Sequence, residues 1–306
     1  INSNFDFFDC FEEYLTSGSL IKSYNTIKAQ RTIKNYLKTF EEETGFVITF
    51  DKLNDLFYEE LMKYSFFEKE IKNNYFAKII AVLKSFVRWS IDKNYTTNRD
   101  FEKFKGIEHD VDIIYLTYDE LIKLYKHDFE NSRLNHVKDF YCMGCFTGLR
   151  FSDLSQLHRA NITETHINIS IQKTKTQNHI ISLNKFSKEI LDKYRGTIYE
   201  PLPKISQQKF NDYIKDCCEI IELDKPTTIT WFIGTKKVQN TVPKHQLITS
   251  HTARKTFITN SLLLGMEPKA IKKIANIKKD AVLDKYMKIT EEYTNQQMDK
   301  WNNHEK

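Results

Sequence analysis

The sequence predicts a mainly α-helical protein with two domains, of which the second carries one small β-hairpin. Its 306 residues are enough for two domains of ordinary size, each with its own core. Only 8 glycines and 5 prolines interrupt the chain, and apolar residues recur at helical spacing along most of it. With 40% hydrophobic and 28% charged residues, the composition is that of a globular protein, and no apolar run approaches the length of a membrane span.

The first part of the chain predicts a compact bundle of helices. Apolar residues form one stripe on each of four segments, which are residues 7–15, 26–43, 51–65 and 74–93. The opposite, basic faces of these helices include Lys34, Lys78, Lys84 and Arg88. Because such runs are often only solvated helix faces, the basic residues by themselves favour an anionic partner weakly.

A polar stretch without clear periodicity follows the bundle at residues 94–111, and we interpret this stretch as the linker region between two domains. We place a linker at residues 106–115, between a first domain of residues 1–105 and a second domain of residues 116–306. The motif Thr117-Tyr-Asp-Glu120 has the form of a capping box, so we expect the first helix of the second domain to begin there.

The second domain is predicted to combine helices with a hairpin. A buried helix over residues 135–146 should end at Thr147-Gly148, and residues 166–172 should pair with residues 179–183. This is the only hairpin that the sequence predicts, and residues 240–247 are expected to be irregular. Further helices are expected over residues 185–194, 206–221, 250–264 and 268–275, and from Asp280 through Tyr286.

Charge and cysteine content indicate the kind of partner and the redox compartment of the protein. The net charge of +5 and the pI near 8.7 are mildly basic. Five cysteines, an odd number, occur without a secretory signal and indicate a reducing compartment. Cys142 and Cys145 form a C-x-x-C that lacks a second pair at zinc spacing, so we expect small buried residues on a helix. The chain begins with Ile1 and not with Met, so we expect a fragment or a processed chain.

Four motifs carry groups that suit chemistry on phosphate. Arg150 stands at the start of a predicted helix, His251 and Arg254 share the first turn of another, Lys173 lies at the hairpin tip, and Tyr286 lies in a lysine-rich segment. Arginine forks neutralise phosphate oxygens, and a tyrosine can attack phosphorus when a base and an acid assist it, without a metal. Each motif alone has an ordinary alternative, namely a surface ion pair, a capped helix start, a solvated turn or a core tyrosine.

In their order and spacing, these motifs resemble the tyrosine recombinase (phage-type integrase) family, especially integrases of bacterial conjugative and mobilisable elements. The resemblance covers nearly the whole chain. It implies that residues 1–105 form a helical, SAM-like core-binding domain and that residues 116–306 form the mostly helical catalytic domain. It also implies an enzyme that cleaves and rejoins DNA through a 3′-phosphotyrosyl intermediate, with no metal and no cofactor, to integrate or excise a mobile element.

The resemblance also implies a role for each residue of the site. Its catalytic residues are Arg150, Lys173, His251, Arg254 and Tyr286. Tyr286 matches the nucleophile, Lys173 matches the acid that protonates the leaving 5′ oxygen, and Asp153 matches the acidic residue that helps to hold Arg150. Lys175, two residues farther along the hairpin, is the alternative to Lys173 as the acid.

Double-stranded DNA at recombination sites is the partner that the resemblance implies, bound between the two domains by a homotetramer. The expected DNA-binding residues are Lys34, Lys78, Lys84, Arg88 and Lys175. Accessory DNA-bending or directionality proteins, and a place on the nucleoid in the bacterial cytoplasm, are implied as well. The tail after Ile289 is expected either to dock on a neighbouring protomer or to fold back on its own domain.

One departure from the family pattern leaves other functions open. The family has Gly-His, or a tryptophan in place of the histidine, nine residues before the tyrosine, where this chain has Asn276-Ile277. Ile277 cannot donate a hydrogen bond to phosphate, which favours a weakened relative that binds DNA and assembles without cutting. A nuclease with His251 as its base is a second alternative, and the lack of a metal-binding cluster in the sequence speaks against its metal-dependent form.

Overall fold

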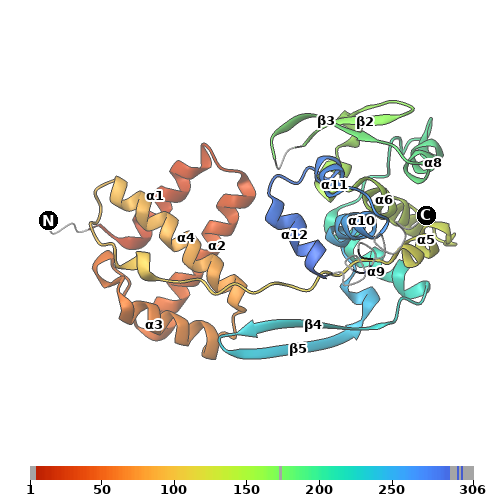
Figure 1. Cartoon of the computed structure of the whole chain (residues 1–306). Helices are drawn as coiled ribbons and strands as arrows, with labels where there is room; N and C mark the ends of the chain where they lie inside the picture. Colours follow the sequence, from red (N-terminus) through yellow and green to blue (C-terminus); the bar gives the residue numbers. More distant parts are fainter. Residues whose placement is uncertain (1–4, 172–173, 290–294, 296–297, 299–306) are drawn as a thin grey trace. The chain divides into compact units, whose positions relative to one another are not determined.

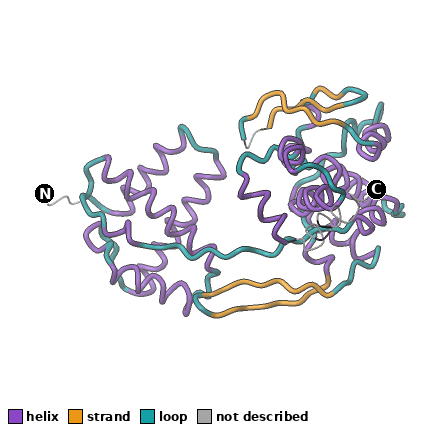
Figure 2. The backbone as a smooth tube through the Cα atoms, in the orientation of Figure 1, coloured by secondary structure: helices purple, strands orange, loops and turns teal. Residues whose placement is uncertain are grey.

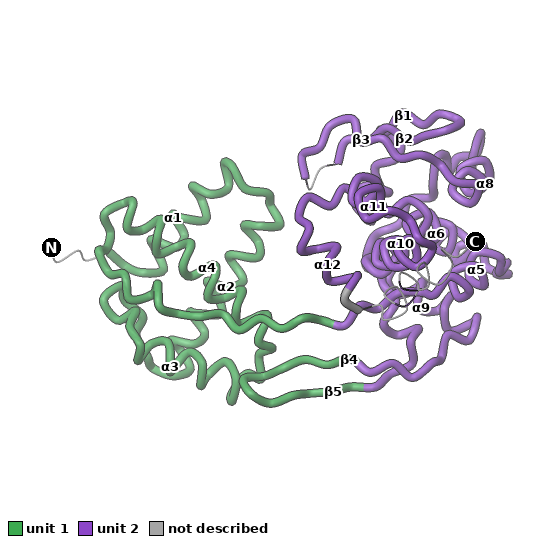
Figure 3. The backbone as a smooth tube through the Cα atoms, in the orientation of Figure 1, with its two compact units in different colours: residues 1–111, 229–240 green, residues 112–228, 241–306 purple. Residues whose placement is uncertain are grey.

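The computed structural model describes residues 5–171, 174–289, 295 and 298, which fall into two compact units. The first unit comprises residues 1–111 and 229–240, and the second comprises residues 112–228 and 241–306 (Figure 3). Helices make up most of both units, so the predicted mainly α-helical fold is confirmed (Figure 2). No described helix is long and apolar enough to cross a membrane.

The first unit contains the four predicted helices. They are α1 (Phe7–Ser19), α2 (Tyr24–Thr44), α3 (Asp55–Lys63) and α4 (Asn73–Asp92) (Figure 1). A π-helical turn, Tyr64–Glu68, extends α3. Aromatic side chains fill the core between the helices, and the rings of Phe11 and Phe86 stack with their centroids 4.2 Å apart. The apolar stripes of the sequence therefore face one another, as an amphipathic bundle requires.

Residues 94–104 belong to this core and not to a linker. Phe101 and Phe104 are 0% and 1% exposed, and the ring of Phe104 stacks on that of Tyr58 with centroids 4.9 Å apart. The segment forms only a short 3-10 helix, Asp100–Lys103, so its apolar residues show no regular period. Because the stretch is polar overall, the burial of its two phenylalanines could not be predicted from its composition.

A second hairpin exists, and the expectation of only one was wrong. It consists of β4 (Pro226–Ile233) and β5 (Lys236–Pro243). Neither strand contains a buried residue, and burial begins only after β5, at Lys244 and His245 of the 3-10 helix Lys244–Leu247. The strands thus lack the alternation of apolar and polar residues by which a half-buried strand is predicted.

The tip of this hairpin belongs to the first unit, where Asn73 holds it. The Asn73 side chain accepts a hydrogen bond from the Gly234 amide at 2.7 Å and donates one to the Gly234 carbonyl at 2.8 Å. The His109 ring stacks on Phe232 with centroids 4.2 Å apart, and the Lys72 ammonium lies 4.1 Å from the centroid of the Trp231 ring. Asn73 is 1% exposed, and its amide finds its partners in Gly234 of the hairpin and in the His109 ring, whose Nε2 lies 3.1 Å away.

The second unit is built around two buried helices, α6 (Ser132–Thr147) and α10 (Ser250–Leu263). Every residue of α6 from Val137 to Thr147 is buried, including Cys142 and Cys145, as the sequence analysis predicts. The predicted capping box between Thr117 and Glu120 is present. Around these two helices lie α5 (Tyr118–Lys126), α8 (Lys185–Tyr194), α9 (Gln207–Ile220), α11 (Pro268–Ile274) and α12 (Asp280–Ile289).

A three-stranded antiparallel sheet completes the second unit. Its order is β1 (Asn161–Ile162), β2 (His166–Ile171) and β3 (Thr176–Ser182), with the predicted hairpin formed by β2 and β3. Ile167, opposite Ile181, is 0% exposed, so one face of the sheet joins the core.

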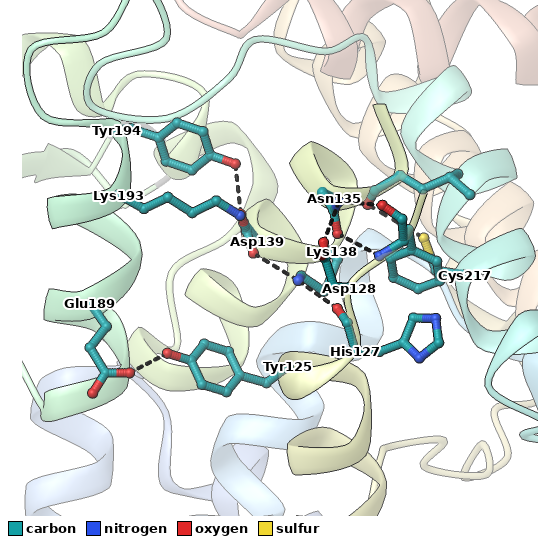
Figure 4. A network of polar contacts seen from close by, with 12 residues as sticks. Tyr125, His127, Asp128, Asn135, Lys138, Asp139, Glu189, Lys193, Tyr194 and Cys217 are labelled. Carbon is teal, nitrogen blue, oxygen red and sulfur yellow. Dashed lines mark hydrogen bonds and ion pairs between the residues drawn. The ribbon is translucent and has the colours of Figure 1, made fainter. Parts of the chain in front are cut away.

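A buried carboxylate ties α6 to α8 (Figure 4). One oxygen of Asp139 accepts hydrogen bonds from Lys193 at 2.6 Å and from the Tyr194 hydroxyl at 2.7 Å. The ammonium of Lys138 lies 3.6 Å from the other oxygen and donates to the His127 carbonyl at 2.7 Å. Because Asp139 is 3% exposed, these partners replace the water that a charged carboxylate would otherwise need.

Candidate active site

Arg150 stands where the sequence predicts it, at the start of a helix. α6 ends at Gly148, whose φ of 69° turns the chain, and Arg150 precedes the short helix α7 (Phe151–Leu154). A side chain at position 148 would be strained by this left-handed backbone, which glycine adopts readily. The turn places Arg150 with its side chain 20% exposed and Asp153 with its side chain almost fully buried.

The guanidinium of Arg150 and the carboxylate of Asp153 face each other without a hydrogen bond between them, although the Asp153 amide donates to the Arg150 carbonyl at 2.9 Å. Nη1 of Arg150 lies 3.9 Å from Oδ2 of Asp153, and within the described residues both buried atoms have no hydrogen-bond partner. Burial raises the pKa of Asp153, while the charges of Arg150 and Arg254 oppose that rise. A buried guanidinium nitrogen left in this way has the capacity to bind one more anionic group.

Arg254 lies in the first turn of α10 and is 7% exposed. Its Nη1 donates to the Gly148 carbonyl at 2.8 Å, which joins the two arginine-bearing motifs directly. Burial lowers the pKa of Arg254 to about 10, and the charge of Arg150 contributes to the decrease. Two arginines that repel each other in a buried place are stabilised when an anion binds between them.

Tyr286 lies on α12 and is 9% exposed. It belongs to an apolar cluster with Phe257, Ile277 and Leu283. Burial raises the pKa of its hydroxyl, and the positive charge of Arg254 lowers it. Phe257 of this cluster lies on α10 with Arg254, and a Cβ added at Gly148 would stand 2.6 Å from its ring, so Tyr286 packs beside the segments that carry the two arginines.

Of the other two predicted catalytic residues, His251 is described by the structure and Lys173 is not. His251 is exposed on the same first turn of α10 as Arg254. Lys173 lies outside the described residues, together with Gln172, and so does the tail except for Asn295 and Met298. Lys175 is exposed at the hairpin tip with a φ of 50°.

Two residues that the sequence analysis did not select connect this hairpin to the segment before Tyr286. Asn276 donates to the hydroxyl of Thr174 at 2.7 Å, and His179 forms a hydrogen bond with the Ile274 carbonyl at 2.8 Å. Ile277, next to Asn276, is 7% exposed and packs in the apolar cluster of Tyr286. Ile277 is therefore a core residue of the site.

The basic residues expected to bind DNA on the first unit differ in their surroundings. Lys34 pairs with Glu12 at 2.7 Å, and its side chain is 16% exposed. Lys84 donates to the Glu102 carbonyl at 2.8 Å, and burial lowers its pKa. Lys78 and Arg88 are exposed on α4. These last two have side chains at the surface, whereas Lys34 and Lys84 already have protein partners.

Comparison with solved structures identifies the fold. The chain is similar to a Tn1549 transposon integrase in complex with transposon right end DNA, with a TM-score of 0.69, 13% sequence identity and coverage of 96% of this chain and 99% of that chain. It is also similar to a lambda integrase dimer bound to a COC′ core site, with a TM-score of 0.65, 15% identity and coverage of 91% and 94%. No family model and no curated protein sequence matches it. The protein has the fold of the tyrosine recombinases, as the resemblance in its motifs predicts.

A third structure of this fold is a lambda integrase tetramer bound to a Holliday junction. Its TM-score is 0.62 at 16% identity, and the similarity covers 91% of this chain and 75% of that one. The shared architecture spans both units of the chain, because coverage of nine-tenths cannot come from one unit alone.

Proposed function

We propose that the protein is a site-specific DNA recombinase that cleaves and rejoins DNA strands through Tyr286, and that it integrates or excises a mobile element. The observation that supports this most is the joining of the two arginine motifs: Arg254 donates to the Gly148 carbonyl, two residues before Arg150, at 2.8 Å, and Nη1 of Arg150 has no hydrogen-bond partner among the described residues. Tyr286 packs in one apolar cluster with Phe257, which lies on the same helix as Arg254. A phosphate diester carries the charge that such a pair of arginines stabilises.

In this proposal, Arg150 and Arg254 bind the non-bridging oxygens of the scissile phosphate. The hydroxyl oxygen of Tyr286 attacks phosphorus, the bond to the 5′ oxygen breaks, and the enzyme keeps the 3′ phosphate as a phosphotyrosine. His251 accepts the phenolic proton, and Lys173 donates a proton to the leaving 5′ oxygen. Attack by the 5′ hydroxyl of another strand reverses the step and rejoins DNA. No bond is hydrolysed, and no metal enters the scheme.

The partner we propose is double-stranded DNA, with four protomers at two recombination sites. The similar structures are named as complexes with DNA, and one of them as a tetramer on a Holliday junction. Lys78 and Arg88 offer exposed positive charge on the first unit for phosphate contacts. Binding should then weaken steeply with salt, because each phosphate contact releases counterions.

The first test is formation of a covalent adduct. The protein is incubated without magnesium on a half-site nicked close to the cleavage position, so that the cut fragment diffuses away. Wild type should give a denaturation-resistant adduct at the 3′ phosphate, and Tyr286→Phe, which loses only the hydroxyl, should bind the site and give none. Tyr118→Phe, at an exposed tyrosine of the same unit, is the matched control and should behave as wild type. An adduct in Tyr286→Phe would refute the assignment.

A second test concerns the phosphate-binding arginines. Lysine lacks the planar fork, so Arg254→Lys should slow adduct formation by roughly 10²–10³, the loss that follows removal of one transition-state donor. Site affinity should change far less, because many other phosphates are contacted. Arg195→Lys, at an exposed surface ion pair, serves as the control.

The same experiments address the alternative functions. A relative that binds DNA and assembles without cutting would shift the site in a native gel but give no adduct. A nuclease would release cut ends without an adduct. Ile277 is the residue that favours the first alternative, since the family's donor is absent there.

A further inference from the structure

The turn between α1 and α2 presents apolar side chains to the solvent. Leu20, Ile21 and Tyr24 are 86%, 82% and 79% exposed. The only charged residue between them, Lys22, is directed back at its own unit, where its ammonium donates to the Tyr14 hydroxyl at 2.9 Å and lies 4.1 Å from the centroid of that ring. The outer side of this turn is therefore apolar, and exposed apolar side chains gathered in one place mark an interaction surface.

The first unit also contains an apolar pocket of about 530 Å³ beside the end of α3. Phe66 and Phe67 line it from the π-helical turn, Ile107 lines it from the segment after the bundle, and Ile233 lines it from the hairpin tip. Phe67 is 83% exposed, so an aromatic ring stands in water at the edge of the pocket. The unit thus has a hollow apolar surface as well as a protruding one.

The backbone beside this pocket is unusual in two respects. The turn that carries Phe67 is π-helical, a rare conformation that occurs often at functional sites. Glu70, which also lines the pocket, has a φ of 47°, in the left-handed region that few residues other than glycine adopt. Both features cost backbone energy and neither buries Phe67, which supports a binding role for this surface.

The charges around the pocket leave a negative excess. Glu59 and Glu70 line it, are exposed, and have no ion pair within the part of the chain that the structure describes. Lys63 also lines it, but its ammonium pairs with Glu60 at 2.7 Å. Lys236 contributes one unpaired positive charge. Two unpaired carboxylates against one unpaired ammonium favour a partner with positive charge.

The turn between α1 and α2 meets that requirement. Lys28 lies one helical turn after Tyr24, is exposed, and has no ion pair to a described residue. Figure 1 shows this turn at the top of the first unit, and the hairpin tip with the end of α3 at the bottom of the same unit. Because the two surfaces lie at opposite ends of one unit, the turn can reach only the pocket of another copy.

We propose that the α1–α2 turn of one copy binds in the apolar pocket of a second copy, with Leu20 and Ile21 in the pocket and Lys28 beside its carboxylates. The contact joins two different surfaces and is therefore heterologous, so repeated contacts either close into a ring or extend as a filament. A ring of four copies is the closure that the proposed function requires, and this part of the inference rests on that function. The contact itself involves no cleavage of DNA.

The first test is disulfide cross-linking between two variants of the full chain. Ile21→Cys places a thiol on the turn, Thr235→Cys places one at the pocket, and the five native cysteines are buried. The two variants, mixed and oxidised with and without duplex DNA, should give disulfide-linked dimers, whereas neither variant alone should. In the matched control, Ile198→Cys, at an isoleucine of the second unit that is 92% exposed, replaces Ile21→Cys and should give none above background.

The second test measures the strength of self-association by sedimentation velocity. Ile21→Ala removes apolar surface from the contact and should weaken it by roughly tenfold or more, whereas Ile198→Ala should have no effect. Lys28→Glu and Glu70→Lys should each weaken it by roughly two- to tenfold, and both changes in one chain should restore it. Restoration by a second charge reversal cannot come from a change in folding, and thermal unfolding of each variant checks the fold directly.

The outcomes separate the contact from the proposed function. A yield no higher than that of the Ile198→Cys control, both with and without DNA, would overturn the inference. So would a disulfide within a single chain that carries both Ile21→Cys and Thr235→Cys, seen at high dilution, because the turn would then fill its own pocket. Cross-linked dimers without a covalent adduct on the half-site would leave the contact standing while the proposed function fails, and an adduct without cross-linking would do the reverse.

Discussion

Substituting Gly148 by alanine should destabilise the second unit far more than the same change at a matched glycine. Gly148 ends α6 with a φ of 69°, and its carbonyl accepts the hydrogen bond from Arg254. An added Cβ would lie 2.6 Å from Cδ1 and 2.9 Å from Cε1 of Phe257. Phe257 is 7% exposed and packs in the cluster that contains Tyr286, so its ring has little room to move.

Two costs add up at this position. The left-handed backbone costs an alanine about 1–2 kcal/mol. Forcing extra volume into a packed core costs about 1–3 kcal/mol more. We therefore expect a loss of about 2–5 kcal/mol in the free energy of unfolding for Gly148→Ala. Gly196→Ala, with a φ of 71° and no described heavy atom within 4 Å of its added Cβ, should show only the first cost.

The measurement compares urea-induced unfolding of the two variants, followed by circular dichroism. Hydrogen exchange of the α6 amides reports on the second unit by itself, since the two units need not unfold together. If Gly148→Ala and Gly196→Ala agree within about 0.5 kcal/mol, the steric argument at Phe257 is wrong. Adduct formation by Gly148→Ala should also fall, because a shift of its carbonyl moves Arg254.

Three further predictions concern stability. Burial raises the pKa of Asp153, so the folded protein keeps that proton to higher pH than the unfolded chain. Stability should therefore decrease through this site as pH rises above the ordinary pKa of an aspartate carboxyl toward the raised pKa of the folded state, and Asp153→Asn should flatten that decrease in urea titrations. Asn73→Ala loses both hydrogen bonds to Gly234 and should cost about 1–3 kcal/mol in thermal unfolding, and an unchanged midpoint would contradict this. Tyr194→Phe removes a hydrogen bond to the buried carboxylate of Asp139 and should cost about 1.5–3 kcal/mol by denaturant titration, well above a typical surface change.

Local sequence patterns were enough to predict most helices, and also the position of two site motifs at the starts of helices. The apolar stripes of α1 to α4 and the capping box at Thr117 depend on residues that are close in sequence. The same holds for Arg150 at the start of α7 and for His251 and Arg254 in the first turn of α10. Local order can be read from the sequence because the residues that determine it are a few positions apart.

Contacts between distant segments could not be predicted in this way. Asn276 and Thr174 are 102 residues apart, and neither carries a pattern that indicates the other. β4 and β5 lack apolar alternation because their side chains are only partly buried or exposed, and Phe101 and Phe104 stand in a polar stretch. Lys34 lies on the predicted basic face of its helix and was expected to be available to DNA, yet it pairs with Glu12, which is 22 positions earlier in the chain.

The bond between Asn73 and Gly234 has a consequence for the order of events during synthesis. The two residues are 161 positions apart, and a ribosome that adds about 5–20 residues each second needs roughly 8–30 s to cover that distance. Throughout that interval, the nascent first unit lacks its segment 229–240, and the Asn73 amide must be solvated or bound elsewhere. The chain that emerges meanwhile contains the rest of the first unit up to residue 111 and then residues 112–228, a large part of the second unit. The first unit therefore cannot complete its fold until residues 112–228 of the second unit have been synthesised, because its last segment follows them in the chain.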